Sequence, residues 1–302
     1  MPEALSRRRS VRALAVGAAL VVSAGCSGTA ERPPAALAPA KALDTTRLTA
    51  LHRLPPVTGL LFTPRLRDAR AQRKIAVACM AARGYRYAPA PPPESPAGTD
   101  ELPKPFGLES TAPPAAAPTA SPEAPPRPGS PESTDAYARA LFGDEAKRVT
   151  ARGERLSVSR PGNGCLAEAE TRVLGDGRMR WLQVRILLFE AEEDSRADVE
   201  KDAAFRAVTT RWRECMDRAG VKALNPVQVQ RSLRSAEERR TSPVAAADLR
   251  CKAETEYLTT AYERLAAVQQ RWLDEHPDIG RDWRKLSARQ EKAAGEVLGT
   301  RG

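Results

Sequence analysis

A pair of short cysteine motifs occurs twice in this chain and in the same order. A Cys-Met-x-x-x-Gly segment is followed by a Cys-x-Ala-Glu-x-Glu segment, first at Cys79 and Cys165 and again at Cys215 and Cys251. We infer an internal duplication, because matching segments in the same order are typical of a repeated structural unit. Four cysteines allow three connectivities. If each copy closes on itself, the disulfides are Cys79–Cys165 and Cys215–Cys251.

A proline-rich stretch lies between the two cysteines of the first copy. Residues 88–133 contain 15 of the 26 prolines and a single aromatic residue, Phe106. Such a composition cannot bury enough apolar surface to offset the entropy lost on ordering. We therefore expect a disordered Pro/Ala-rich insertion at 88–133, with residues 44–87 and 134–299 forming a single helical domain. The insertion also explains why the cysteines are farther apart in the first copy than in the second.

The first 25 residues have the pattern of a secretory signal peptide: four arginines within residues 7–12 precede 13 uncharged residues. Thirteen residues span only about 20 Å as a helix, which is too short for a hydrocarbon core of roughly 30 Å. The end of this segment, Ser23-Ala24-Gly25-Cys26, resembles the lipobox of bacterial lipoproteins, although that family prefers an aliphatic residue where Ser23 stands. The resemblance implies that Cys26 is lipidated and becomes the mature N-terminus. The alternative is ordinary cleavage nearby, which would leave Cys26 as a free thiol.

Residues 26–43 are small, rich in Ala and Pro and sparsely charged, which predicts a flexible tether. Removing residues 1–25 lowers the formal net charge from +10 to +7. We expect a protein on the outer face of the cytoplasmic membrane, held there by its lipid anchor. A basic chain in that place favours an envelope polymer or a protein as partner. Nucleic acid is not expected, because the charges are interspersed and no pattern of stacking aromatics accompanies them.

Helix start and stop signals flank the first cysteine of each copy. Thr63 followed by Pro64 predicts a helix start, and Gly84 predicts its end in the left-handed conformation. In the second copy the corresponding helix is expected to start at Ser195 and to end at Gly220. The Cys-Met pair would then lie on the last helical turn in both copies.

The second cysteine of each copy is expected to begin a helix. Asn163 and Asp248 are the predicted N-caps, and acidic residues near a helix start complement its dipole. Residues two apart on a helix face away from each other, so the following acids make a poor acid–base pair. These acids are Glu168, Glu170, Glu254 and Glu256.

The remaining segments also predict helices. Arg178–Glu193 is the most apolar run after the signal peptide; we expect a buried helix, the alternative being a strand after a hairpin turn at 175–177. Toward the C-terminus, apolar residues step by three and four on both sides of residues 275–278, which predicts two amphipathic helices. Their apolar stripes are expected to be core; the alternative is a docking face for a partner. The predicted fold class is all-α, braced by disulfides.

Catalytic motifs are sparse in this sequence. It has two histidines, no nucleophile elbow, no phosphate-binding glycine loop and no cysteine or histidine spacing typical of a metal site. We therefore expect no catalytic residue, no metal and no cofactor. The alternative is a carboxylate-dependent cell-wall hydrolase, because its acids need no proximity in sequence.

The lipobox-like segment, the Cys-Met-x-x-x-Gly motif, a Gly-Cys helix start and Trp212 three residues before Cys215 together resemble uncharacterised secreted lipoproteins of high-GC actinobacteria. That family supplies no activity to carry over. The resemblance implies export, lipidation and disulfides. The function expected is a non-catalytic binding or structural role at the cell envelope.

Overall fold

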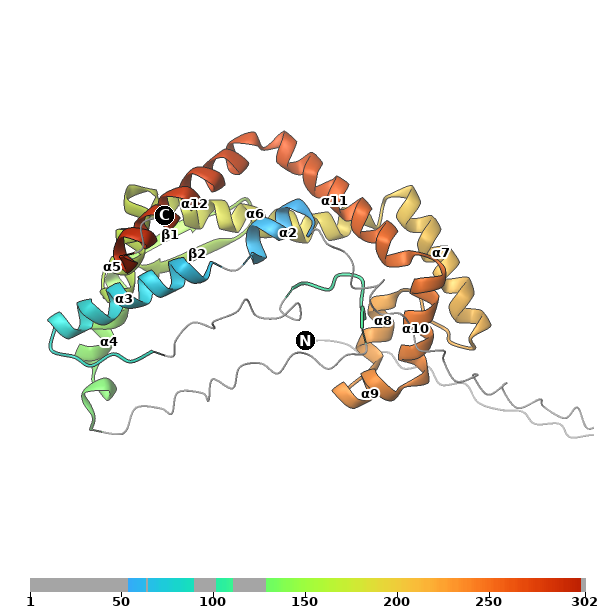
Figure 1. The fold of residues 1–302 in the computed structure, drawn as a ribbon, viewed down its shortest axis with the longest axis horizontal. Helices are drawn as coiled ribbons and strands as arrows, with labels where there is room; N and C mark the ends of the chain where they lie inside the picture. Colours follow the sequence, from blue (N-terminus) through green and yellow to red (C-terminus); the bar gives the residue numbers. More distant parts are fainter. Residues whose placement is uncertain (1–53, 64, 90–101, 111–128, 300–302) are drawn as a thin grey trace, which may run out of the picture. The chain divides into compact units, whose positions relative to one another are not determined.

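The computed structural model describes residues 54–63, 65–89, 102–110 and 129–299. The predicted signal peptide, the tether and the lipidation site Cys26 lie outside these residues. The described part is all-α apart from one small hairpin, as the sequence predicts (Figure 1). None of its helices combines the length and the apolar character that crossing a membrane requires.

The elements of the first half are the helices and 3-10 turns around the hairpin. In chain order they are α2 (Pro56–Phe62), α3 (Leu66–Ala82), η2 (Pro131–Ser133), α4 (Asp135–Phe142), η3 (Glu145–Lys147), β1 (Arg148–Arg152), β2 (Ser157–Pro161), α5 (Cys165–Leu174), η4 (Gly175–Gly177) and α6 (Arg178–Val199). The elements of the second half are all helices: α7 (Ala203–Arg218), α8 (Pro226–Ser232), α9 (Ala236–Thr241), α10 (Pro243–Glu254), α11 (Tyr257–Glu275) and α12 (Pro277–Leu298).

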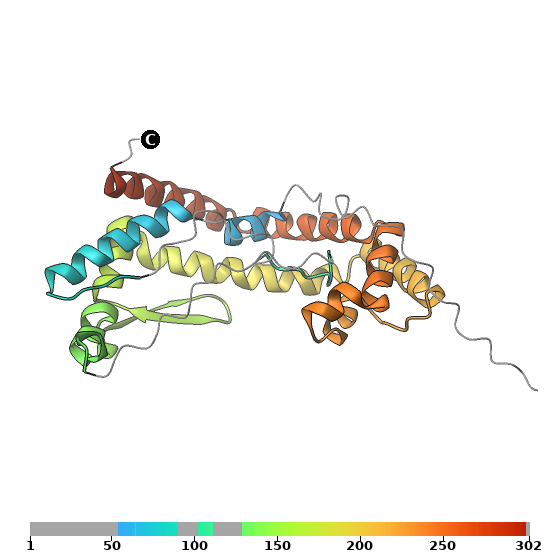
Figure 2. The ribbon, with the colours of Figure 1, turned by 60° about the horizontal axis from the view of Figure 1, so that its bottom comes forward.

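Long helices connect two main hydrophobic cores. The first core contains α2, α3, α5, α12 and most of α6, and the second contains α7, α10 and the start of α11. Helix α6 packs against both α11 and α12, and Figure 2 shows them side by side. Trp181 of α6 stacks on Trp283 of α12 with ring centroids 4.5 Å apart.

Three helix predictions are confirmed. The apolar run from Arg178 forms a helix, which extends to Val199, and the two C-terminal helices meet at His276. Their stripes are core, because Leu265 and Trp283 are buried with their apolar neighbours in the two clusters.

The structure joins the cysteine pairs that the duplicated motif predicts. Cys79 pairs with Cys165 and Cys215 with Cys251, each with Cα atoms 5.6 Å apart. The helix endings repeat as well. Gly84 and Gly220 have φ angles of +79° and +76°, and the next residue donates its N–H to the carbonyl of the motif methionine, at 3.0 Å and 2.9 Å.

A glutamate three residues after the second cysteine lies against the disulfide in both copies. The Oε2 atom of Glu168 is 3.2 Å from the sulfur of Cys79, and that of Glu254 is 3.5 Å from the sulfur of Cys215. The two copies thus share a pairing, a helix ending and a carboxylate contact, which supports an internal duplication.

The predicted helix starts of the first copy are corrected. Thr63 ends α2, donating its hydroxyl to the carbonyl of Gly59, and α3 begins at Leu66. Asn163 does not cap α5; its side chain binds Asp144, and Gly164 stands at the cap with φ +87°. Asn163 therefore ties the loop after α4 to the start of α5 instead of capping a helix.

The predicted starts of the second copy are also wrong. Ser195 lies within α6, buried, and α7 begins after Asp202, whose carboxylate accepts the N–H groups of Ala204 and Phe205. Asp248 lies inside α10, fully buried. The second cysteine thus begins a helix only in the first copy, and Glu254 lies at the end of α10, where an acid does not complement the dipole.

A β-hairpin, which the sequence analysis did not anticipate, precedes α5. Strands β1 and β2 pair antiparallel from Arg148↔Pro161 to Arg152↔Ser157. Strand β1 alternates exposed and more buried side chains, but the run has only five residues and only Ala151 in it is buried; the side chains of β2 are mostly exposed, so the two strands give a weak sequence signal. A buried carboxylate, Glu190 of α6, holds the turn by accepting three successive backbone N–H groups, at 2.9, 2.7 and 2.6 Å.

Part of the proline-rich stretch belongs to the core, which corrects the expectation for residues 102–110. Phe106 and Leu108 are 4% and 5% exposed and pack in the second core. The carbonyl of Leu108 accepts a hydrogen bond from the buried Lys252, and Glu109 is bound by Tyr262. These apolar and polar contacts together hold the segment in place, although its average composition predicts disorder.

Candidate functional site

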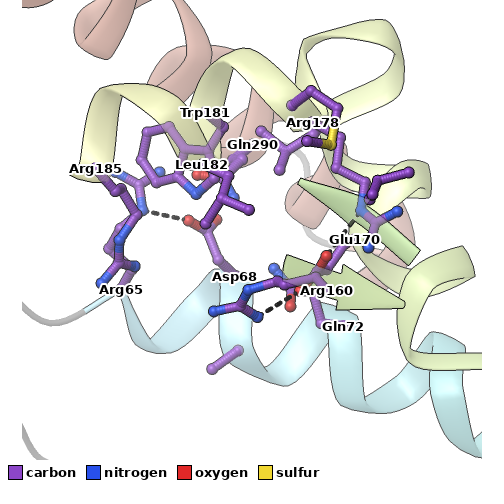
Figure 3. A pocket seen from close by; sticks show the side chains of 14 residues that line it. Arg65, Asp68, Gln72, Arg160, Glu170, Arg178, Trp181, Leu182, Arg185 and Gln290 are labelled. Atoms are coloured by element: carbon purple, nitrogen blue, oxygen red, sulfur yellow. Dashed lines mark hydrogen bonds and ion pairs between the residues drawn. The ribbon is translucent and has the colours of Figure 1, made fainter. Parts of the chain in front are cut away.

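A polar pocket lies where α3, α5, α6, α12 and the hairpin meet, and we call it the arginine pocket (Figure 3). Its volume is about 240 Å³. Helix α3 contributes one wall, and α6 contributes Trp181 with the residues around it. Its fourteen lining residues are Arg65, Asp68, Ala69, Gln72, Val149, Arg160, Glu170, Leu174, Arg178, Met179, Trp181, Leu182, Arg185 and Gln290.

Two buried acceptor atoms of this pocket have no hydrogen-bond partner among the described residues: Oδ1 of Asp68 and Oε1 of Gln290. Both side chains are almost fully buried, at 4% and 2% residue exposure. A buried acceptor without a partner costs about 1–3 kcal/mol. Both atoms are shielded from solvent, so a ligand that brings hydroxyl or amino donors to them would recover that free energy only together with a small movement of the two side chains.

The second oxygen of Asp68 is bound. It accepts from Nε of Arg65 at 2.6 Å, and the Arg65 guanidinium also lies over the Trp181 ring, 5.2 Å from its centroid. Burial raises the pKa of Asp68, and the nearby Arg65 opposes this shift only in part. Asp68 is therefore a carboxyl group whose burial is only partly compensated by its ion pair with Arg65.

Positive charge exceeds negative charge in the lining, which contains four arginines and two carboxyl groups. Glu170 already accepts from two of the arginines, Arg160 at 3.0 Å and Arg178 at 2.8 Å. Arg185 makes no ion pair with any described residue. Although the residue as a whole is exposed, desolvation of its guanidinium lowers the pKa of Arg185, as do the neighbouring Arg160 and Arg65. An uncompensated guanidinium beside others of the same sign is suited to bind an anion.

The acids that the sequence analysis singled out do not form one site. Glu170 lines the arginine pocket, whereas Glu168 and Glu254 lie at the two disulfides. Glu256 follows α10 with φ +53°, a left-handed conformation that is rare for a residue other than glycine. Within the described ranges, no group of three or more His, Cys, Asp or Glu residues is arranged to hold a metal ion.

Asp68, Arg185 and Gln290 are pocket residues that the sequence analysis did not identify. They lie on three helices that are far apart in the chain, so no local motif links them. One signal was present: Gln290 occupies a position in the apolar stripe of the last helix, and a polar residue there requires a reason for its burial.

Comparisons with protein-family models, with curated proteins and with solved structures gave no match for this chain. The class of the protein therefore rests on its own fold and site: an all-α, disulfide-braced domain with a small arginine-rich pocket.

Proposed function

We propose that this chain is a lipid-anchored extracytoplasmic binding protein of the cell envelope, and that its ligand is a small anion that also carries hydrogen-bond donors. One observation supports this ligand class above all: the unpaired acceptors of Asp68 and Gln290 lie in a pocket with an excess of arginine. The acceptors favour hydroxyl or amino groups, and the arginines favour phosphate or carboxylate. Glycerol phosphate, a unit of teichoic-acid-like polymers, combines both features.

The size of the pocket limits the ligand further. Pockets for drug-sized ligands have volumes of about 300–1,000 Å³. The arginine pocket, at about 240 Å³, suits a single small unit, such as the exposed end of a polymer. This supports recognition of one terminal group over the long groove that polysaccharide cleavage requires.

The binding test is calorimetric titration of the folded, oxidised protein with sn-glycerol 3-phosphate. Glycerol, which has the donors without the charge, and sulfate, which has charge without donors, are the comparison ligands. We expect Arg185→Gln to weaken binding of glycerol 3-phosphate by about 10- to 100-fold, as for loss of a charged hydrogen bond. Arg211→Gln, an exposed arginine of α7 outside the pocket, is the matched control. Equal binding by both variants, or no heat with glycerol 3-phosphate, would contradict the proposed ligand class.

The proposed location and lipid anchor require a separate measurement, which is the intact mass of the protein extracted from membranes. A chain that begins at Cys26 and carries acyl groups is the expected result. The sequence pattern at residues 1–26 supports this, as do the two disulfides, which are typical of exported proteins. An unlipidated chain with a free Cys26 would overturn the anchor and leave the pocket proposal untouched.

A carboxylate-dependent hydrolase is the second candidate, because Asp68 and Glu170 line the same pocket. Burial raises the pKa of Asp68, as in a general acid. This candidate predicts clearing of cell-wall material in a zymogram, lost on Asp68→Asn or Glu170→Gln. A gel that stays uncleared with the refolded wild-type protein would exclude it.

A further inference from the structure

A second and larger pocket, which we call the aromatic groove, shares no lining residue with the arginine pocket. It has a volume of about 710 Å³ and lies among α7, α8, the end of α6 and the ordered part of the proline-rich stretch. Pro105 and Phe106 line it from that stretch, so the groove exists because these residues dock on the second core.

Aromatic rings form the apolar part of the groove. Phe106 and Phe205 have ring centroids 5.6 Å apart, and Phe205 and Tyr257 are 5.8 Å apart. Leu224 also lines the groove and is 68% exposed, the most exposed large hydrophobic side chain among the described residues. The rings themselves are almost fully buried, at 4%, 8% and 1% exposure, so an apolar side chain of a partner would pack chiefly on Leu224.

The charge of the groove is strongly positive. Four arginines and one carboxylate, Glu200, line it. Arg196 is bound to Glu192, but Arg206, Arg213 and Arg231 make no ion pair with any described residue. Exposed guanidiniums around an apolar floor match a partner that carries carboxylates beside an apolar side chain.

Polar side chains between the apolar ones distinguish a peptide from a lipid as the occupant. Thr209, Thr210, Asn225 and Gln228 also line the groove. The amide oxygens of Asn225 and Gln228 accept backbone N–H groups within the chain, which leaves their amide nitrogens available as donors. An acyl chain would desolvate these groups without pairing them, whereas a peptide backbone offers carbonyl acceptors.

We propose that the aromatic groove binds an extended acidic peptide segment of a partner protein through one apolar anchor residue and two or three flanking carboxylates. This site is independent of the arginine pocket and of its ligand. The protein would then hold a small envelope ligand in the arginine pocket and a protein partner in the aromatic groove.

The experiment uses fluorescence anisotropy with a fluorescein-labelled peptide, Glu-Asp-Leu-Phe-Glu-Asp. The first comparison peptide replaces every acid by its amide, and the second replaces Leu-Phe by Ala-Ala. We expect only the first peptide to bind measurably, with an affinity that falls several-fold between 50 and 200 mM salt. Equal binding of the acidic and amide peptides would overturn the proposal.

The variants locate the site. The double variant Arg213→Gln/Arg231→Gln should weaken the acidic peptide at least 10-fold, whereas Arg211→Gln, on α7 but outside the groove, should leave it unchanged. Phe205 is left intact, so the core is not disturbed. A loss of binding as large in Arg211→Gln would show nonspecific attraction and refute the site. Displacement of the peptide by phosphatidylglycerol vesicles, with a phosphatidylcholine control, would indicate a lipid surface instead.

Discussion

A buried ion pair in the second core offers the sharpest test of this structure. The side chains of Lys252 and Asp248 are both 0% exposed, with Nζ of Lys252 2.9 Å from Oδ2 of Asp248. Lys252 also donates to the carbonyl of Leu108 at 2.5 Å, and Asp248 accepts from Nε1 of Trp212 at 3.0 Å. The substitution Lys252→Met keeps most of the side-chain volume and removes the charge and both hydrogen bonds.

The expected cost follows from what Lys252→Met leaves behind. Removing one partner of a buried pair costs about 3–5 kcal/mol, because the remaining charge is uncompensated. The carbonyl of Leu108 also loses its partner, so the variant should release the ordered part of the proline-rich stretch. We expect a loss of about 4 kcal/mol in the free energy of unfolding at pH 7.

The cost should depend on pH. Burial already raises the pKa of Asp248, with Lys252 opposing the shift, so the variant raises that pKa further. When the pKa of a carboxyl is higher in the folded state, the free energy of unfolding of the protein falls as pH rises above the unfolded pKa of that carboxyl, about 3.9. The difference between wild type and Lys252→Met should therefore be smaller at pH 5 than at pH 7.

The assay is urea unfolding of the oxidised protein, followed by circular dichroism at 222 nm. Lys222→Met is the control, because Lys222 pairs with Asp217 at 3.0 Å while both side chains are more than half exposed; it should cost under about 1 kcal/mol. The double variant Asp248→Asn/Lys252→Met removes the stranded charge and should recover about 2 kcal/mol. Equal losses for Lys252→Met and Lys222→Met, or no recovery in the double variant, would refute the reasoning.

Three further substitutions test other contacts by urea unfolding. Glu190→Gln should cost about 1.5–3 kcal/mol at pH 7, because three backbone N–H groups lose a charged acceptor. Although desolvation opposes them, these bonds lower the pKa of Glu190, so its contribution is present above its unfolded pKa of about 4.3 and is lost as pH falls. Phe106→Ala should cost about 3–5 kcal/mol, whereas a disordered segment would tolerate it. Replacing Cys79 and Cys165 by Ser removes the disulfide that spans a sequence separation of 86 and should cost up to about 4.6 kcal/mol relative to the oxidised wild type.

Hydrophobic periodicity predicted the long helices because their burial repeats along one face. Leu265 and Trp283 lie on stripes that local spacing alone reveals, and both are buried. The strands at Arg148–Arg152 and Ser157–Pro161 were missed because what holds them is remote in sequence. Their turn depends on Glu190, about 35 residues away.

Some helix boundaries were wrong for a related reason. Asp248 has the chemistry of an N-cap, and the same carboxylate serves equally well in a core where Lys252 and Trp212 surround it. Which role it takes depends on the partners that packing brings within hydrogen-bond distance. The position of Asp248 shortly before Cys251 in the sequence does not show which partners packing will bring near it.

The sequence by itself determined the all-α class and the two disulfides, because helix periodicity and a repeated cysteine motif are local signals. Tertiary structure alone decided the two pockets. Asp68 and Gln290 lie 222 residues apart and meet only because α3 and α12 pack together. Phe106 joined the core because burial of a few side chains can outweigh the average composition of the stretch around them.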